Sequence, residues 1–144
     1  MYPHAQFKAL WTWFEGEVRS GAVTIAEVAF VEVGHKAPDC QALLAQFEIN
    51  RHGIGQTEVQ HALAIKAALG IVNDAYAGGV DESDILIIAV AKVKGLELVT
   101  SESRQTILPT LRANYKMPAV CNLPEAQVTS LRLIEYIRQS QQVF

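Results

Sequence analysis

The sequence has few cysteines, no long hydrophobic run and no excess of basic residues, and each absence excludes a class of protein. Cys40 and Cys121 are its two cysteines, and they form neither a CxxC motif nor a zinc-binding spacing. We therefore expect two reduced, partly buried thiols, as is typical of cytoplasmic proteins. No apolar run reaches the roughly 18 residues that a membrane-spanning helix needs, and no signal peptide is recognisable. The sequence thus favours a cytoplasmic protein without a membrane segment.

Charge and composition are ordinary for a folded domain. The formal net charge of −3 provides no global basic surface, so nucleic-acid binding would need a local patch. Half of the residues are hydrophobic and 19% are charged, which is typical of an ordered globular protein. With 144 residues and no repeat, low-complexity tract or linker, the chain is expected to form one domain over residues 1–144. The histidines show no ligand spacing, and surface or core roles are expected for them (His4, His35, His52 and His61).

Helical patterns alternate with short strand-like segments along the chain. Helices are predicted near residues 4–20, 24–35, 40–47, 57–69, 84–94 and 118–123, and after residue 130. Strands are predicted at "AVTI", "FEIN", "LELVT" and "QVTS". Hydroxyl side chains are expected to cap three of the helices (Thr24, Thr57 and Ser130). This alternation predicts an α/β fold with a parallel sheet.

The stretch "DESDILIIAVAKVKGLELVTSESR" places carboxylates before one dense apolar run and after another. Asp81, Ser83 or Asp84 can cap a helix that ends at Gly95, and a buried strand is expected to follow it. The helix would be about 16 Å long at ~1.5 Å per residue, and the strand would run back by about the same length. Asp84 and Glu102 should therefore meet at the carboxyl end of the strand, where open α/β sheets bind ligands.

Two neighbouring carboxylates repel each other unless a cation lies between them. Hard oxygen ligands favour Mg²⁺ or Mn²⁺ over zinc, so Asp84 and Glu102 form a candidate metal site. The alternative is a helix cap and an exposed loop acid. Glu32, in "AEVAFVEVGH", is a third candidate carboxylate, and Glu27 competes with it about equally.

Several segments together resemble the PIN-domain-like proteins, in particular a bacterial PIN-like subfamily of undefined function related to the VapC-type ribonuclease toxins. The segments are "FKALWTWFEGEVRSG", "AEVAFVEV", "SDILIIAVAKVKGLELVTSE", "YKMPAVC" and "VTSLRLIEYIR". The most specific of them is the third, with an Asp-led apolar helix, a glycine turn and a strand that ends in Val-Thr-x-acid. The likeness covers nearly the whole chain, and the order and spacing of the motifs support it.

This resemblance implies a three-layer αβα fold with a parallel sheet of order 3-2-1-4-5. It also implies a cluster of carboxylates that holds Mg²⁺ or Mn²⁺. Asp84 matches the acid at the start of the penultimate long helix, Glu102 the acid after "VT", and Glu32 the early helical acid. Thr100, Ser101 and Ser103 could orient a bound water or the metal ligands.

The family's first, central strand and its Asp have no counterpart in the sequence. The chain begins at "MYPHAQF", about where the family's helical approach to the Trp segment ends. Loss of a central strand leaves its two neighbours with unpaired backbone groups. The alternatives are a late start of the chain, direct closure of the sheet, or a strand borrowed from another copy in a homodimer.

The implied activity is metal-assisted hydrolysis of RNA phosphodiester bonds. The metal would activate a water for in-line attack, and Arg104, Arg112 and Lys116 could contact phosphates. A single-stranded or loop RNA is the expected substrate, and an antitoxin protein is the expected partner. The alternative is a catalytically impaired nuclease-like protein that binds proteins or dimerises.

Overall fold

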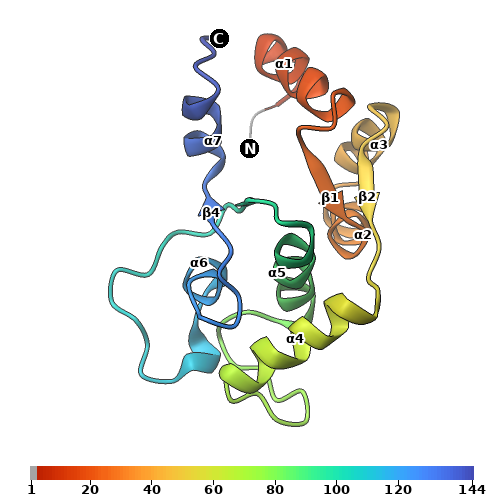
Figure 1. Ribbon diagram of the computed structural model, residues 1–144. Helices are drawn as coiled ribbons and strands as arrows, with labels where there is room; N and C mark the ends of the chain where they lie inside the picture. Colours follow the sequence, from red (N-terminus) through yellow and green to blue (C-terminus); the bar gives the residue numbers. More distant parts are fainter. Residues whose placement is uncertain (1–2) are drawn as a thin grey trace. The chain divides into compact units, whose positions relative to one another are not determined.

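The computed structural model describes residues 3–144 and shows an α/β protein. In this part of the chain there are seven α-helices, one short 3₁₀ helix and four short strands (Figure 1). The strands form two separate two-stranded sheets, and both sheets are parallel. The chain divides into two compact units. The first comprises the described residues up to Gly53 together with Val143–Phe144, and the second comprises Ile54–Gln142.

The first unit contains the sheet of β1 and β2. Its elements follow one another as α1 (Lys8–Arg19), β1 (Thr24–Ala26), α2 (Glu27–Lys36), α3 (Pro38–Gln46) and β2 (Asn50–His52). Thr24 lies opposite Asn50 and Ala26 opposite His52 in a parallel register. Two parallel neighbours need a crossover connection between them, and α2 and α3 provide it.

An apolar cluster of its own stabilises the first unit. The buried members are Val18, Phe30, Leu44, Phe47 and Ile49. Trp11 and Phe14 of α1 pack against this cluster, and their rings meet edge to face with centroids 5.8 Å apart. These two aromatic side chains of α1 thus serve the core of the first unit.

The second unit contains the sheet of β3 and β4. Its elements are α4 (Gln56–Ala68), α5 (Glu82–Lys94), β3 (Leu98–Val99), the 3₁₀ helix η1 (Arg112–Asn114), α6 (Met117–Cys121), β4 (Ser130–Leu131) and α7 (Leu133–Gln139). Leu98 lies opposite Ser130 and Val99 opposite Leu131. The helices α4 and α5 pack side by side (Figure 1).

The core of the second unit forms around α5. Ile85, Ile88 and Ala89 of this helix are at most 1% exposed. They join Ile65 and Leu69, which are buried on and just after α4. Because α5 packs against apolar partners, its first turn is held in a fixed position. The carboxylates of that turn, described below, are therefore fixed as well.

The predicted α/β fold is confirmed, but some boundaries and all three hydroxyl caps differ. Thr24 and Ser130 belong to strands β1 and β4, and Thr57 is the second residue of α4. The residues that precede the three helices in question are Ala26, Gly55 and Arg132. The three cap predictions were wrong because each helix starts one to three residues away from the hydroxyl residue that was expected to cap it.

None of the helices in residues 3–144 is both long enough and apolar enough to cross a bilayer.

Candidate functional site

The first turn of α5 is closed by two reciprocal hydrogen bonds. The Asp84 backbone N–H donates to Oδ1 of Asp81 at 2.9 Å, and the Asp81 N–H donates to Oδ2 of Asp84 at 3.0 Å. Asp81 is thus the cap among the three residues considered from the sequence. This arrangement is a capping box, and the positive end of the helix dipole favours both carboxylates.

The end of α5 reverses the chain. Gly95 adopts the left-handed conformation with φ of 65°, and its N–H donates to the carbonyls of Ala91 and Lys92. Glycine adopts this conformation without the strain that a Cβ would cause. The Leu96 N–H then bonds to the Ala91 carbonyl at 2.9 Å, and β3 begins two residues later. The predicted helix, glycine turn and strand are therefore present, although the strand is shorter than expected.

Glu102 follows β3 and caps another helix. Its Oε2 accepts a hydrogen bond of 2.7 Å from the backbone N–H of Met117, the first residue of α6. Its own N–H donates to Oγ1 of Thr100 at 3.2 Å, so Thr100 fixes the turn that carries Glu102. Ser101 and Ser103, on either side of Glu102, are exposed.

One segment, residues 113–117, joins the two candidate acids. The Val80 N–H donates to the Tyr115 carbonyl at 3.0 Å, directly before the capping residue Asp81. Two residues further along the segment, Met117 binds Glu102. The start of α5 and the Glu102 carboxylate are therefore both attached to the same short piece of backbone in the second unit.

The third candidate acid belongs to the first unit. Glu32 lies on α2, where its carboxylate is 3.5 Å from the Lys36 ammonium one turn later. Glu27 begins the same helix directly after β1, and its carboxylate is 3.7 Å from the Arg51 guanidinium. Of these two acids, Glu27 is the one that lies at the carboxyl end of a parallel strand.

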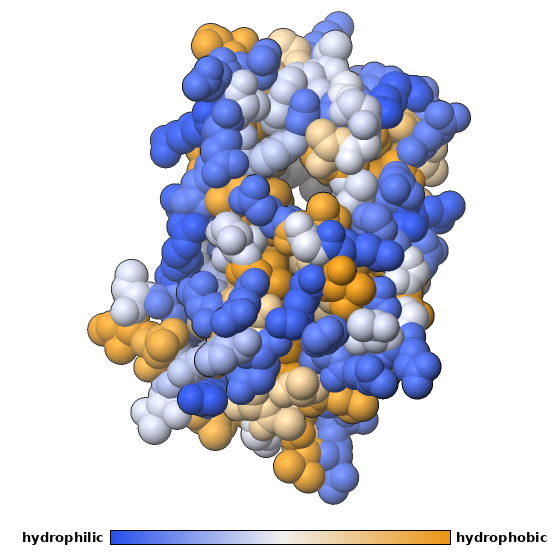
Figure 2. Space-filling model, in the orientation of Figure 1, coloured by the Kyte–Doolittle hydropathy of each residue, from blue (hydrophilic) through white to orange (hydrophobic). Residues whose placement is uncertain are grey.

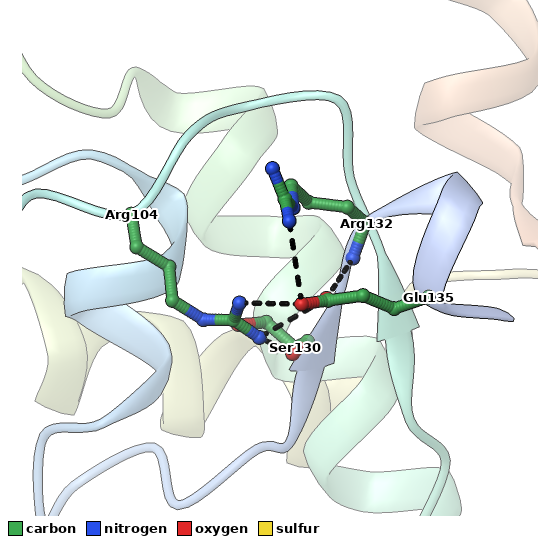
Figure 3. Close-up of polar contacts among 4 residues, drawn as sticks. All are labelled: Arg104, Ser130, Arg132 and Glu135. Atoms are coloured by element: carbon green, nitrogen blue, oxygen red, sulfur yellow. Dashed lines mark hydrogen bonds and ion pairs between the residues drawn. The ribbon is translucent and has the colours of Figure 1, made fainter. Parts of the chain in front are cut away.

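Arg104, one of the predicted phosphate contacts, forms the most extensive ion pair near the site. Its guanidinium binds both carboxylate oxygens of Glu135, at 2.7 and 3.1 Å, and also the Ser130 carbonyl at 3.2 Å (Figure 3). Glu135 also accepts the Arg132 N–H at 2.8 Å. The hydrogen bonds from Arg104 and Arg132 lower the pKa of Glu135 to about 2, and the carboxylate raises the pKa of Arg104. Sequence reasoning missed this contact because Glu135 carries no local signal of a partner 31 residues away.

The other two predicted phosphate contacts also bind protein groups. The Arg112 guanidinium donates to the Ala68 carbonyl at 3.4 Å. The Lys116 ammonium donates to the Gly78 carbonyl at 3.0 Å. Each of the three basic side chains thus stabilises the fold of the second unit.

A polar cavity of about 420 Å³ lies beside Arg104. The other residues around it are the last residue of α6, the residue after it, the three residues that precede β4 and the first residue of β4 (Cys121, Asn122, Gln127, Val128, Thr129 and Ser130). Burial raises the pKa of the Cys121 thiol to about 12, and the nearby charge of Glu102 acts in the same direction. The thiol is therefore protonated at neutral pH and is no candidate nucleophile.

The candidate acids match Mg²⁺ or Mn²⁺ in donor type. Asp84 and Glu102 offer carboxylate oxygens, the ligands that these cations prefer. Residues 3–144 contain no group of three or more His, Cys, Asp or Glu side chains arranged to hold a metal ion. In the second unit the described structure thus provides two acids of the predicted set and not the third.

The fold and the site define an α/β protein with short parallel sheets and with carboxylates at the starts of two helices. The chain belongs to the family described as "Domain of unknown function (DUF4411)", which matches it over residues 1–144. No curated protein and no solved structure matches the chain.

Proposed function

We propose that the protein is a cytoplasmic, metal-dependent ribonuclease of the toxin–antitoxin type with a PIN-like fold. One observation supports this proposal above the others. Residues 113–117 hold both the start of α5, which carries Asp84, and the carboxylate of Glu102. Two acids at helix starts in an α/β fold are an arrangement suited to a hard divalent cation.

The pairing of the strands supports the finer proposal about the fold. A three-layer αβα protein with strand order 3-2-1-4-5 that lacks strand 1 would retain two parallel pairs, 3-2 and 4-5. The described strands form two such pairs, β2 with β1 and β3 with β4. We assign them to the four outer positions of the family order, and residues 3–144 provide no strand for the central position.

In this proposal each side chain has a role that follows from its contacts. Asp84 and Glu102 bind Mg²⁺ or Mn²⁺, and their hydrogen bonds to Asp81 and Met117 hold the two carboxylates in place. When bound, the metal lowers the pKa of a water and offsets the charge that develops on the phosphate. Glu32, with Glu27 as its alternative, stays a prediction for the third acid of the set, and both residues belong to the first unit.

The residues near the acids act on the water and on the RNA. Thr100 positions the turn that carries Glu102, and the exposed Ser101 and Ser103 can orient a water or a metal ligand. Arg104, Arg112 and Lys116 would contact phosphates of a single-stranded RNA through donors beyond those that bind the protein. An antitoxin protein would block this surface.

A second candidate function is a catalytically impaired nuclease-like protein that binds another protein or dimerises. The capping contacts favour it, because Asp84 and Glu102 each accept a hydrogen bond from backbone N–H. The ion pair of Arg104 with Glu135 favours this second function as well, because Glu135 occupies the guanidinium that would otherwise bind an RNA phosphate.

Calorimetric titration of the intact chain with Mn²⁺ tests the metal site. We expect binding that Asp84→Asn weakens roughly tenfold or more, because the substitution removes a charged ligand. Asp39→Asn, at an exposed acid of α3 in the first unit, is the matched control and should leave the affinity unchanged. Absence of binding at millimolar metal would exclude the site.

An RNA cleavage assay with Mn²⁺ separates the two candidate functions. The ribonuclease proposal requires cleavage by the wild-type chain and loss of cleavage in Glu102→Gln. Equal cleavage by both proteins would exclude the mechanism. Metal binding without cleavage by either protein would favour the impaired, protein-binding alternative.

A further inference from the structure

The cavity of about 420 Å³ in the second unit has a buried floor and an exposed rim. Cys121 and Val128 form the floor and are 0% and 5% exposed. Asn122, Gln127 and Thr129 form the rim and are exposed. Ligand pockets of proteins have volumes of about 300–1,000 Å³ and combine apolar surface with a few polar groups. In size and in lining, this cavity therefore suits a small organic molecule.

Backbone hydrogen bonds hold the residues around the cavity. The Val128 N–H donates to the Cys121 carbonyl at 2.9 Å, and the Gln127 N–H donates to the Leu123 carbonyl at 2.9 Å. The Thr129 carbonyl accepts a further bond of 2.9 Å from the first residue of β3. Because the lining is already ordered, binding of a ligand requires little additional ordering of the chain.

Gln127 has an unusual backbone conformation. Its φ is 52°, in the left-handed region that residues other than glycine rarely adopt. Residues held in this region are concentrated at active sites and ligand-binding sites, where the surrounding structure maintains them. The side chain of Gln127 lies at the rim of the cavity, so its conformation is consistent with a role in binding.

The polar side chains of the rim are available to a ligand. Within residues 3–144, the side chains of Asn122, Gln127 and Thr129 form no hydrogen bond with another protein group. Each carboxamide offers an acceptor oxygen and an NH₂ donor, and the hydroxyl of Thr129 can donate or accept. The rim therefore presents donors and acceptors side by side.

The loop of residues 103–111 contributes one side chain to the cavity, that of Arg104. At the base of the loop, Gln105 donates to the Asn114 carbonyl at 3.3 Å and accepts the Lys116 N–H at 2.8 Å. The loop stands away from α5 and α6 in Figure 1, and Figure 2 shows hydrophobic side chains on its outward side. The fixed base of the loop thus holds the Arg104 guanidinium beside the rim.

The charges around the cavity favour a neutral polar ligand. Arg104 carries the only ionised side chain of the lining, and its guanidinium binds both oxygens of the Glu135 carboxylate (Figure 3). An anion would have to compete with Glu135, and a cation would meet no carboxylate among the lining residues. The bonds to Glu135 and to the Ser130 carbonyl leave the Nε–H and one Nη1–H of the guanidinium for a ligand.

The cavity lies close to Glu102, one of the candidate metal ligands. Glu102 binds the N–H of Met117, the first residue of α6, and Cys121 in the cavity floor is the last residue of this helix. At ~1.5 Å per residue, the two ends of α6 are about 6 Å apart. Burial raises the pKa of the Cys121 thiol, and the charge of Glu102 adds to this effect, as expected for groups near each other.

We propose that the cavity binds one nucleobase of the RNA, beside the phosphodiester bond that is cleaved. Carboxamide side chains such as those of Asn122 and Gln127 pair with the donor and acceptor groups of base edges. Guanidinium planes stack on unpaired bases, and Arg104 offers such a plane. The inference deepens the proposed ribonuclease function and rests on it, because it treats the ligand as a base of the RNA substrate.

Calorimetric titration of the intact chain with AMP, GMP, CMP and UMP, in EDTA and without added metal, tests the proposal. We expect at least one of these nucleotides to bind roughly tenfold more tightly than ribose 5-phosphate, which lacks the base. Equal affinities for all of these compounds would overturn the proposal, because the base would then contribute nothing. Absence of binding at millimolar concentration would overturn it as well.

Substitutions at the rim test which side chains contact the base. Gln127→Gly removes the carboxamide and suits the left-handed backbone, so the protein should fold and bind the preferred nucleotide roughly tenfold more weakly. Thr129→Val keeps the shape of the side chain without its hydroxyl and should also weaken binding. Gln141→Gly is the matched control, because Gln141 is exposed, has a φ of 58° and lies outside the cavity. Wild-type affinity in both rim variants would overturn the proposal.

A short single-stranded RNA of the preferred base distinguishes an RNA strand from a free nucleotide. We expect the RNA to bind more tightly than the mononucleotide, and Gln127→Gly to weaken the binding of both. Equal affinity for the two compounds would identify a free nucleotide as the ligand and overturn the proposal. Because these titrations contain no metal, failure of the Mn²⁺ and cleavage experiments would count against the proposed function and not against nucleotide binding.

Discussion

At the scale of single residues, Glu135 is a carboxylate of the second unit that accepts hydrogen bonds from two arginine residues. It joins the base of the 103–111 loop to the start of α7 through Arg104 and the Arg132 N–H. A two-pronged guanidinium–carboxylate contact fixes the direction of both groups as well as their distance. Glu135 therefore determines where the loop leaves the body of the unit.

The lowered pKa of Glu135 predicts how stability depends on pH. The carboxyl titrates near 4.5 without partners and near 2 in the folded protein, so the folded state binds this proton less readily than the unfolded chain. The resulting stabilisation is complete above the unfolded pKa and is lost as pH falls from about 4.5 towards 2. Glu135→Gln should lower the urea midpoint at neutral pH and approach wild type at the acidic end of this range.

Urea unfolding of both proteins across that range measures the effect. Glu48→Gln is the control, because this side chain is 85% exposed and should have little influence at any pH. A difference between wild type and Glu135→Gln that stays constant down to the acidic end would contradict the assignment.

At the scale of elements, the contact between residues 78–80 and residues 113–115 holds the candidate site together. A Cβ at Gly79 would lie 2.4 Å from the Tyr115 carbonyl oxygen and 2.5 Å from that of Ala113. Both atoms are backbone, so they cannot move aside as a flexible side chain would. The glycine is therefore required for the close approach that also forms the hydrogen bond from Val80 to Tyr115.

Gly79→Ala is predicted to separate these two segments. We expect a loss of about 2 kcal/mol or more in the free energy of unfolding, the usual size of an overpacking penalty. Gly78→Ala is a matched control from the neighbouring position, where the added atom meets only Asn114 Oδ1 at 3.5 Å. Chemical denaturation should show Gly78→Ala within about 0.5 kcal/mol of wild type. Equal losses in both variants would show that the close approach is unimportant.

The sequence predicted elements well where their signals are local. The sequence narrowed the cap of α5 to Asp81, Ser83 or Asp84, and Asp81 is the one that caps it; the end of the helix was predicted because glycine favours the left-handed conformation. Thr24 and Ser130 were misassigned as caps because each pairs with a strand segment more than 25 residues away, Thr24 with Asn50 and Ser130 with Leu98. Local capping preferences contain no information about such partners.

The same distinction applies to the candidate site. The sequence could predict that Asp84 and Glu102 lie at the two ends of one helix–turn–strand segment, because one helix, one turn and one strand separate them. The attachment of Glu102 to Met117 and of Arg104 to Glu135 could not be predicted, since each contact closes a long loop. Glu32 was predicted from a likeness in its segment, and the structure places it in the first unit beside Lys36.

At the scale of the whole molecule, the described residues form two units, and each unit has its own apolar cluster and its own parallel pair of strands.

The position of the first apolar cluster along the chain has a consequence for synthesis on the ribosome. All of its members, from Trp11 to Ile49, precede the first residue of the second unit, and so does the whole ladder of β1 and β2. Chains emerge amino-terminus first at about 5–20 residues per second, slowly compared with the collapse of a small domain. This cluster and its ladder can therefore assemble while the ribosome is still translating the codons for α5, so the nascent chain need not expose Trp11 and Phe14 until synthesis ends.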